Sequence, residues 1–246
     1  MNTMLRYLDE IQATLAKVRH SQLESMHKAA RILADATISG QNLFVFGSNH
    51  AGILALELYY RTGGLVNMNP IRGPGLNLDV TPANMSSQFE RMEGYGNMLI
   101  DYSPLRAGDV LLIHSVSGRN QVSIDAAGRA REIGAKVIVL TNMATSKIVI
   151  SRHQNGKKLY ELADLVIDNC GQVGDAALQL PGTSTRVGST STAIGAVILN
   201  AIVCETAELI ISAGLSAPVF VSSNIDGGDE QNKAVLEAYK DHIFYM

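Results

Sequence analysis

The sequence predicts an α/β protein, a three-layer αβα sandwich with a parallel sheet of flavodoxin or Rossmann-like type and about five strands. Two observations support this fold class. Short continuous apolar runs, typical of strands buried on both faces, alternate along the chain with helical stretches. The 246 residues are 46% hydrophobic and only 17% charged, which provides enough apolar side chains for one large core. Strands that alternate with helices need crossover connections, and these make the strands parallel.

Residues 1–40 are predicted to form an N-terminal helical segment, because apolar side chains recur at helical spacing from Leu5 to Leu33. The first strand, Asn42–Gly47, opens a second region, residues 41–246, that holds the sheet. A helix follows over Ala51–Thr62 and ends at two glycines. The later elements are expected in this order: a weaker strand at Leu65–Met68, a strand at Asp109–His114, a helix at Gln121–Ile133, strands at Ala135–Thr141 and Ala163–Asp168, a helical region at Thr183–Ala213, an apolar run at Pro218–Ser222 and a closing helix at Asp229–His242.

Residues 69–104 interrupt this alternation. Four of the six prolines lie in this insert, which has no clear hydrophobic period. A stretch of this length without regular structure inside a compact domain is usually a functional loop. An oligomer contact and a disordered flap are the alternatives, and the sequence leaves them open.

The composition argues against several classes of protein. A net charge of −3 and the absence of any Lys/Arg run give no basic surface for nucleic acid or for an anionic membrane. Charged residues within Met1–Lys17 argue against a secretory signal, and the apolar stretch Ala193–Cys204 is too short to span a bilayer. Cys170 and Cys204 have neither metal-ligand nor redox spacing, and the histidines are not paired, so we expect a cytoplasmic protein without a disulfide, a zinc site or another metal.

The turns that follow the predicted strands are rich in Ser, Thr, Asn and Gly. In open parallel sheets, ligands bind beyond the carboxyl ends of the strands, where glycines let backbone approach an anion and hydroxyls donate to it. The same residue types are good helix caps, which is the alternative for any single turn. Several such turns at one sheet edge favour a phosphate site. The turns are Gly47–Gly52, Ser115–Asn120, Thr141–Asn142, Asn169–Gly171 and Gly188–Thr192.

The first of these turns matches neither of two common nucleotide-binding motifs. Gly47–Gly52 has the outer glycines of a Walker loop but no Lys-Ser or Lys-Thr after them. It also lacks the middle glycine of the dinucleotide fingerprint. We therefore expect no NAD, and no organic cofactor.

Three segments resemble the sugar isomerase (SIS) domain: Phe46–Gly52, Ile113–Asn120 and Val137–Thr141. The second segment matches the S-x-S-G-x-[ST/N] phosphate loop of that family, and the order and spacing extend over most of the chain. Relatives include phosphoheptose isomerase, an etherase and sugar-sensing regulators, and the greatest similarity is to uncharacterised single-SIS-domain proteins. The resemblance implies the SIS fold and phosphosugar binding, but it specifies the reaction less well because one domain serves several activities.

The resemblance also assigns phosphate-binding residues. The phosphate contacts it implies are Ser48, Asn49, Ser115, Ser117, the backbone N–H of Gly118, Asn120 and, in a later helix-entry turn, Thr190. Asn120 stands where the family more often has a threonine, so its contact is a departure from the pattern.

Glu57 is the candidate base for an aldose–ketose isomerisation, which moves a proton between adjacent carbons. Apolar neighbours would desolvate its carboxylate, and phosphoheptose isomerase has a base at a similar distance into this helix. The alternative is an ion pair with Arg61 at i,i+4. His50 lies seven residues earlier, on the same predicted helical face, and a histidine there suits ring opening or simply a bond to local backbone.

Three further groups carry a chemical and a structural interpretation. His114 ends a buried strand and is a neutral core histidine or, second, a site residue. Glu205 interrupts an apolar helix face and is a buried base or an interface pair. The charges of Glu90–Gly94 in the insert are a lid over a sugar, a solvated face or a subunit contact.

The sequence therefore predicts a phosphosugar isomerase that needs no cofactor, with Glu57 as base and His50 assisting. A phosphosugar sensor without catalysis is the second hypothesis. A lyase or etherase that pairs Glu57 with Glu90 or Glu205 is the third. The predicted partner is a small sugar phosphate, without nucleic acid or membrane, and the resemblance implies a homodimer or homotetramer.

Overall fold

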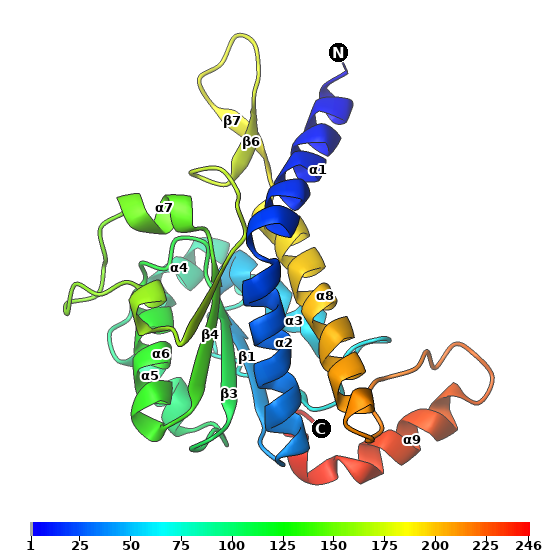
Figure 1. Ribbon diagram of the computed structural model, residues 1–246. Coiled ribbons are helices and arrows are strands. Elements are labelled where there is room, and N and C mark those ends of the chain that lie inside the picture. Colours follow the sequence, from blue (N-terminus) through cyan, green and yellow to red (C-terminus); the bar gives the residue numbers. More distant parts are fainter. Residues whose placement is uncertain (1) are drawn as a thin grey trace.

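Five apolar segments pair into one sheet in the order β2-β1-β3-β4-β5, and all neighbouring strands are parallel (Figure 1). This computed structural model describes residues 2–246. Helices cover both faces of the sheet, which confirms the predicted αβα sandwich. The strands are β1 (Leu43–Gly47), β2 (Met68–Pro70), β3 (Val110–His114), β4 (Lys136–Thr141) and β5 (Leu165–Asp168).

The central strands are apolar at almost every position because both of their faces are buried. In β1, Leu43 and Val45 join one core cluster, whereas Phe44 and Phe46 join the other. Successive side chains of a strand point to opposite faces, so neither face tolerates a polar residue here. Each such side chain contributes about 1.5–3 kcal/mol on burial.

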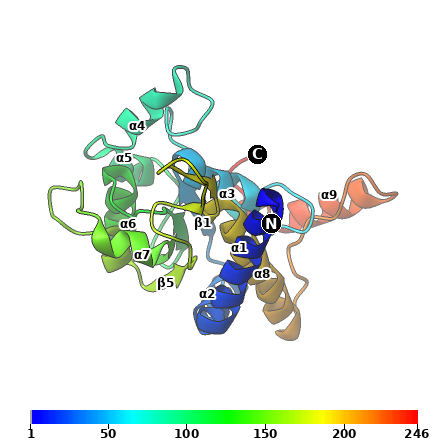
Figure 2. The same cartoon turned by 90° about the horizontal axis from the view of Figure 1, so that it is seen from above.

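Two helical layers enclose the sheet (Figure 2). The first consists of α2 (Leu23–Ile38), α3 (Gly52–Leu58) and α8 (Ser191–Ser212). The second consists of α5 (Tyr95–Asp101) and α6 (Gln121–Ile133). Helix α6 has the predicted bounds and ends at Gly134, whose φ of +95° suits glycine.

The predicted N-terminal helical segment is divided at Gln22 into α1 (Thr3–Ser21) and α2. The side-chain carbonyl of Gln22 accepts the N–H of Asp168 at 3.0 Å, which anchors the break to the end of β5. This contact is tertiary, so helical periodicity could not reveal it.

A hairpin of β6 (Ala176–Gln179) and β7 (Arg186–Ser189) precedes α8, so the region predicted as helical from Thr183 begins with a strand and is helical only from Ser191. All four residues of β7 are exposed, so it lacks the apolar pattern that would predict a strand. The hairpin projects beside α1 from one end of the molecule (Figure 1), and the Tyr7 hydroxyl donates to the Ser189 carbonyl at 2.6 Å.

Helix α3 and strand β2 also differ from prediction. Helix α3 ends at Leu58 rather than near Thr62, because Tyr59 is extended and Tyr60 has a φ of +48°. Strand β2 begins at Met68, and Leu65 forms an isolated antiparallel bridge with Val219.

The insert at residues 69–104 contains short helices, and one of them, α5, packs on α6. It contains a 3-10 turn (Ala83–Met85), α4 (Ser86–Phe89) and α5. Gly96 allows the close approach, because a Cβ there would lie 2.1 Å from the Val122 carbonyl oxygen. Helix α5 is therefore part of the packed layer, whereas most of residues 79–93 is exposed or only partly buried.

The apolar stretch Ala193–Cys204, predicted to be too short for a membrane span, lies within α8, which has the length and apolar composition of such a span. Its residues Ile194, Ile198 and Ile202 are buried among side chains of α2 and the sheet.

The chain ends in a tail that covers the edge of the sheet at β2. The amide of Asn69 donates to the His242 carbonyl at 2.9 Å, and its side-chain oxygen accepts the Phe244 N–H at 2.8 Å. The ring of Phe244 stacks on Phe44 with centroids 5.9 Å apart. The remaining helical elements are 3-10 turns at Asn49–Ala51, Leu159–Leu162 and Lys240–His242, and helices α7 (Met143–Ile148) and α9 (Gly228–Ala238).

Candidate functional site

The turn Ser115–Asn120 links β3 to α6, and side chains of the neighbouring strand and helix fix its backbone. The Thr141 hydroxyl donates to the Ser115 carbonyl at 2.7 Å, and the Ser146 hydroxyl donates to the Ser117 carbonyl at 3.0 Å. Gly118 has a φ of +57°, and a Cβ there would lie 3.2 Å from the Leu159 Cβ. The turn is thus held rigidly at the carboxyl end of the sheet, as an anion cradle requires.

The donors of this turn are only partly engaged. The Gly118 N–H makes a long bond of 3.3 Å to the Ser115 hydroxyl oxygen. Within the described chain, no bond joins the Ser117 hydroxyl to another group. Asn120 is the N-cap of α6, yet its side chain does not cap the helix. Its Oδ1 instead accepts from the Arg152 guanidinium at 2.7 Å.

The turn after β1 carries two donors that bind a carboxylate, one buried and one partly buried. The Ser48 hydroxyl donates to one oxygen of Glu90 at 2.7 Å, and the Asn49 amide donates to the other at 3.0 Å. The Glu90 carbonyl also accepts the Val122 N–H at 3.2 Å, which places Glu90 beside the start of α6. This turn therefore accepts an anionic group, and Glu90 of the insert lies at the site.

Three arginines lie at or near these turns. Arg91 was predicted only as one of the possible lid charges of Glu90–Gly94, and neither Arg119 nor Arg152 was predicted as a site residue. Arg119 lies within the phosphate-loop motif, and its carbonyl accepts the Arg152 N–H at 2.8 Å. Burial together with the charges of Arg119 and Arg91 lowers the pKa of Arg152, while the Glu90 carboxylate opposes that shift. Arg119 could have been noticed in the motif, whereas nothing in the sequence places Arg91 and Arg152 beside it.

The turns after β4 and β5 meet the start of α8. The Asn142 amide donates to the Asn169 side-chain oxygen at 2.8 Å, and a Cβ on Gly171 would lie 3.3 Å from the Thr190 hydroxyl oxygen. Thr190 is therefore at the predicted edge. Its hydroxyl donates to the carboxylate of Asp175 at 3.2 Å, so it is engaged in the cap of α8.

Buried polar atoms without a hydrogen-bond partner gather at this edge. An unpaired buried group costs about 1–3 kcal/mol and is uncommon in native proteins, so a cluster of them indicates a binding site. The atoms at the edge are Asn49 Oδ1, His114 Nε2, Arg119 Nε, Gln121 Oε1 and Asn169 Nδ2; Asn67 Oδ1 and Ser123 Oγ are the others found in the described chain.

His114 joins the two main turns. Its Nδ1 lies 3.2 Å from the Ala51 carbonyl, which makes this nitrogen the donor, and the ring is almost completely buried. Burial lowers the pKa of His114 to about 4, although the bond to Ala51 and the charge of Asp175 oppose the shift. His114 is thus a neutral histidine at neutral pH, in agreement with its interpretation as a core residue.

Glu57 lies at the end of α3, half-buried against α8. Its carboxylate pairs with Arg61 and accepts from the Asn200 amide at 2.9 Å. The i,i+4 ion pair is thus present, and a role in proton transfer stays a prediction. His50 is exposed in the 3-10 turn that precedes α3. Glu205 pairs with His27 of α2, so it links two helices of the same layer.

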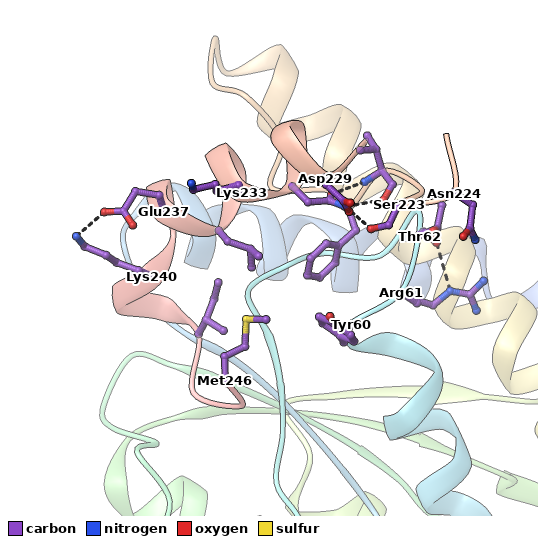
Figure 3. A pocket seen from close by; sticks show the side chains of 15 residues that line it. Tyr60, Arg61, Thr62, Ser223, Asn224, Asp229, Lys233, Glu237, Lys240 and Met246 are labelled. Atoms are coloured by element: carbon purple, nitrogen blue, oxygen red, sulfur yellow. Dashed lines mark hydrogen bonds and ion pairs between the residues drawn. The ribbon is translucent and has the colours of Figure 1, made fainter. Parts of the chain in front are cut away.

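A cavity of about 640 Å³ lies elsewhere, between α9 and the loop after α3 (Figure 3). Tyr60, Arg61, Lys233 and Met246 are among the residues that line it. It lies apart from the strand-end turns, so cavity volume alone does not locate the site. Across residues 2–246, no three His, Cys, Asp or Glu side chains come together as a metal-binding group.

The fold and the edge together define a class: a doubly wound α/β domain whose strand-end turns are built to accept an anion. Residues 6–142 match the family model of the SIS domain, and the chain belongs to that family. A UPF0309 protein from Shouchella clausii is 46% identical over 246 residues, which is 100% of both chains. A UPF0309 protein from Geobacillus kaustophilus is 40% identical over 238 residues, 97% of this chain and 94% of the relative.

Solved structures share the fold at low identity. A phosphoheptose isomerase from Francisella tularensis has a TM-score of 0.57 at 13% identity and covers 84% of this chain and 98% of its own. Phosphoheptose isomerase GmhA from Neisseria gonorrhoeae has a TM-score of 0.55 at 17% identity, with 82% and 96% covered. These likenesses confirm the predicted SIS fold.

Proposed function

We propose that this protein binds a sugar phosphate at the carboxyl edge of the sheet and isomerises it between aldose and ketose forms. The observation that carries the proposal is the convergence of fixed donors, arginines and unpaired buried polar atoms at the turns after β1 and β3. Ser115, Ser117, the N–H of Gly118 and Asn120 would hold the phosphate, and Ser48 and Asn49 would add donors once Glu90 moves.

The comparisons support this ligand class. A structurally similar protein, c3406 of E. coli CFT073, was solved in complex with a sugar phosphate, with a TM-score of 0.51 at 14% identity. Two of the other similar folds are phosphoheptose isomerases. Thr190 would make the outermost contact with the phosphate. For this contact its hydroxyl must turn away from Asp175.

An enediol route moves one proton between two adjacent carbons and changes no oxidation state overall. Glu57 would remove the proton from one carbon and return it to the next. Its bond to Asn200 orients the carboxylate, whereas the ion pair with Arg61 must open for the carboxylate to act as a base. His50 would exchange a proton with the ring oxygen as the sugar opens.

A phosphosugar sensor is the second candidate, and the engagement of Glu57 by both Arg61 and Asn200 favours it. A lyase or etherase has less support, because Glu205 is paired with His27. Glu90 is the only second carboxylate of that hypothesis that lies at the site.

The proposal also includes a cytoplasmic homodimer or homotetramer. Apolar side chains of the packed helices α3 and α8 remain exposed, among them Leu56 at 48%, Val197 at 49% and Ile211 at 60%. A second copy would cover them, because exposed apolar surface is typical of protein–protein interfaces. Light scattering should give a mass above that of one chain, and Leu56→Glu should reduce it.

The experiment that tests the function is a thermal-shift screen of sugar phosphates, followed by solvent deuterium incorporation at carbon for each ligand that binds. Exchange that Glu57→Gln abolishes, with binding retained, would support the isomerase. Binding without exchange in the wild type would identify a sensor. If Ser117→Ala leaves the affinity of every sugar phosphate unchanged, the phosphate assignment is wrong.

A further inference from the structure

Arg152 is docked onto the phosphate turn by two hydrogen bonds, although it lies on the loop after α7. Its guanidinium donates to the Asn120 side-chain oxygen at 2.7 Å, and its backbone N–H donates to the Arg119 carbonyl at 2.8 Å. Asn120 holds the N-cap position of α6, where its side chain would ordinarily bond to the helix backbone. Here that oxygen binds an arginine instead.

Positive charge is in excess around this docking point. Arg91 and Arg119 both lie within electrostatic range of Arg152, and Glu90 is the carboxylate within that range. Glu90 is bonded to Ser48 and Asn49 rather than to a guanidinium. The nearby Asp125 is engaged by His153 at 2.9 Å, so it does not neutralise the arginines directly.

One of these guanidiniums has an unused donor. Arg119 Nε is buried and has no hydrogen-bond partner in the described chain. Because guanidinium donors suit phosphate oxygens, an unpaired one directly after Gly118 indicates an acceptor supplied by the ligand.

We propose that Arg152, positioned by Asn120 and assisted by Arg119, makes this anion site selective for a doubly charged phosphate monoester over a singly charged ester of the same shape. This inference rests on the proposed function. The hydroxyls and backbone N–H groups of the turn are neutral donors, so they distinguish little between one and two negative charges. Guanidiniums that lie close together repel one another, and a bound anion offsets this repulsion. A doubly charged anion offsets more of it than a singly charged one, so its affinity is raised more.

The proposal gives the asparagine of the motif a role of its own. Asn120 acts as a positioning residue, because its oxygen holds the Arg152 guanidinium in place. Asn120→Thr would restore the commoner hydroxyl of the motif and a good N-cap, but it would release the guanidinium. We expect that variant to bind phosphate and to lose discrimination between the two charges.

The test compares methyl phosphate with methyl sulfate, which carry two and one negative charges at pH 8 because the second pKa of a phosphate monoester is about 6. Affinities are measured by NMR titration at low salt for the full chain. For the wild type we expect methyl phosphate to bind about tenfold tighter, the size of a single well-placed charge interaction. Arg152→Gln should reduce that ratio to below about threefold.

Two further variants separate charge from structure. Arg152→Lys keeps the charge without the planar fork, and it should retain most of the ratio. Arg31→Gln removes an exposed arginine from α2, alters the net charge equally and should leave the ratio unchanged. Far-UV circular dichroism confirms that each variant is folded.

The outcomes distinguish this inference from the proposed function. If the wild type binds both esters equally, or Arg152→Gln keeps the wild-type ratio, the inferred selectivity is wrong and phosphate binding stands. If the wild type binds neither ester nor any sugar phosphate in the thermal-shift screen, the proposed function fails and the inference with it.

Discussion

The two turns that form the site are built in opposite ways. The turn after β3 has its carbonyls bound by Thr141 and Ser146 of the neighbouring strand and helix, while the Ser117 hydroxyl faces no partner in the described chain. The turn after β1 has its donors occupied by Glu90, which belongs to the insert. One turn is thus a fixed cradle, and the other is closed by an internal anion. The difference shows that two turns at one sheet edge can be held in place by different means, one through its carbonyls and the other through its side-chain donors.

The largest effect is expected at the fixed turn, from Gly118→Val. The φ of +57° is strained for a branched residue, and its side chain would meet Leu159 and Ser146. We expect a loss of about 1–3 kcal/mol in the free energy of unfolding and phosphate binding too weak to titrate. Urea denaturation and ligand titration measure the two effects.

Gly128→Ala is the matched control within the adjacent helix. No atom lies within 4 Å of a Cβ at Gly128, and alanine is the better helix former by about 0.5–1 kcal/mol. This variant should be slightly more stable and should bind normally. Wild-type affinity in Gly118→Val would show that the turn is less rigid than the hydrogen bonds indicate.

The next effect concerns His114, which joins the two turns. Its pKa of about 4 in the folded chain lies below the ordinary value of 6.5, so the unfolded chain binds a proton first as the pH falls. The contribution of His114 to the free energy of unfolding is fully present above pH 6.5. It falls by roughly 3 kcal/mol in all as the pH is lowered toward 4. His114→Gln should remove most of that slope in urea titrations at pH 7, 6 and 5. An unchanged slope would mean that folding does not lower the pKa of His114.

The smallest effect is expected at the closed turn, from Glu90→Gln. Removal of the internal carboxylate eliminates its repulsion of the incoming phosphate, so affinity should rise about tenfold at low salt and less at high salt. Glu93→Gln, an exposed neighbour in the insert, serves as the control. Weaker phosphate binding in Glu90→Gln would instead make Glu90 part of the ligand contact.

Sequence patterns located the buried scaffold well. Strands β1 and β3 start within one residue of prediction, because burial on both faces demands an apolar run. The hairpin β6–β7 was missed because β7 is exposed along its length, and the division at Gln22 depends on a contact with Asp168. Local patterns do not record such contacts.

The candidate site, like the fold, could be predicted from the sequence only in part. Its turns follow from strand ends, and their Ser, Asn and Gly residues predict an anion site. Arg91 and Arg152 lie far from the motif in sequence, and only the folded chain brings Arg152 to Asn120 and Arg91 within range of Arg152. The ion pair between Glu57 and Arg61 was anticipated from i,i+4 spacing, whereas the bond from Asn200 required the packing of α8 on α3.

The tail along β2 has a practical consequence for handling the protein. The side-chain amide of Asn69 binds the backbone at His242 and Phe244, so the tail is held against β2, an edge strand that could otherwise pair with another chain. Proteolytic nicking near Tyr239 would therefore loosen the tail and leave β2 more open to such pairing. Affinity tags are better placed before α1, which already projects into solvent (Figure 1).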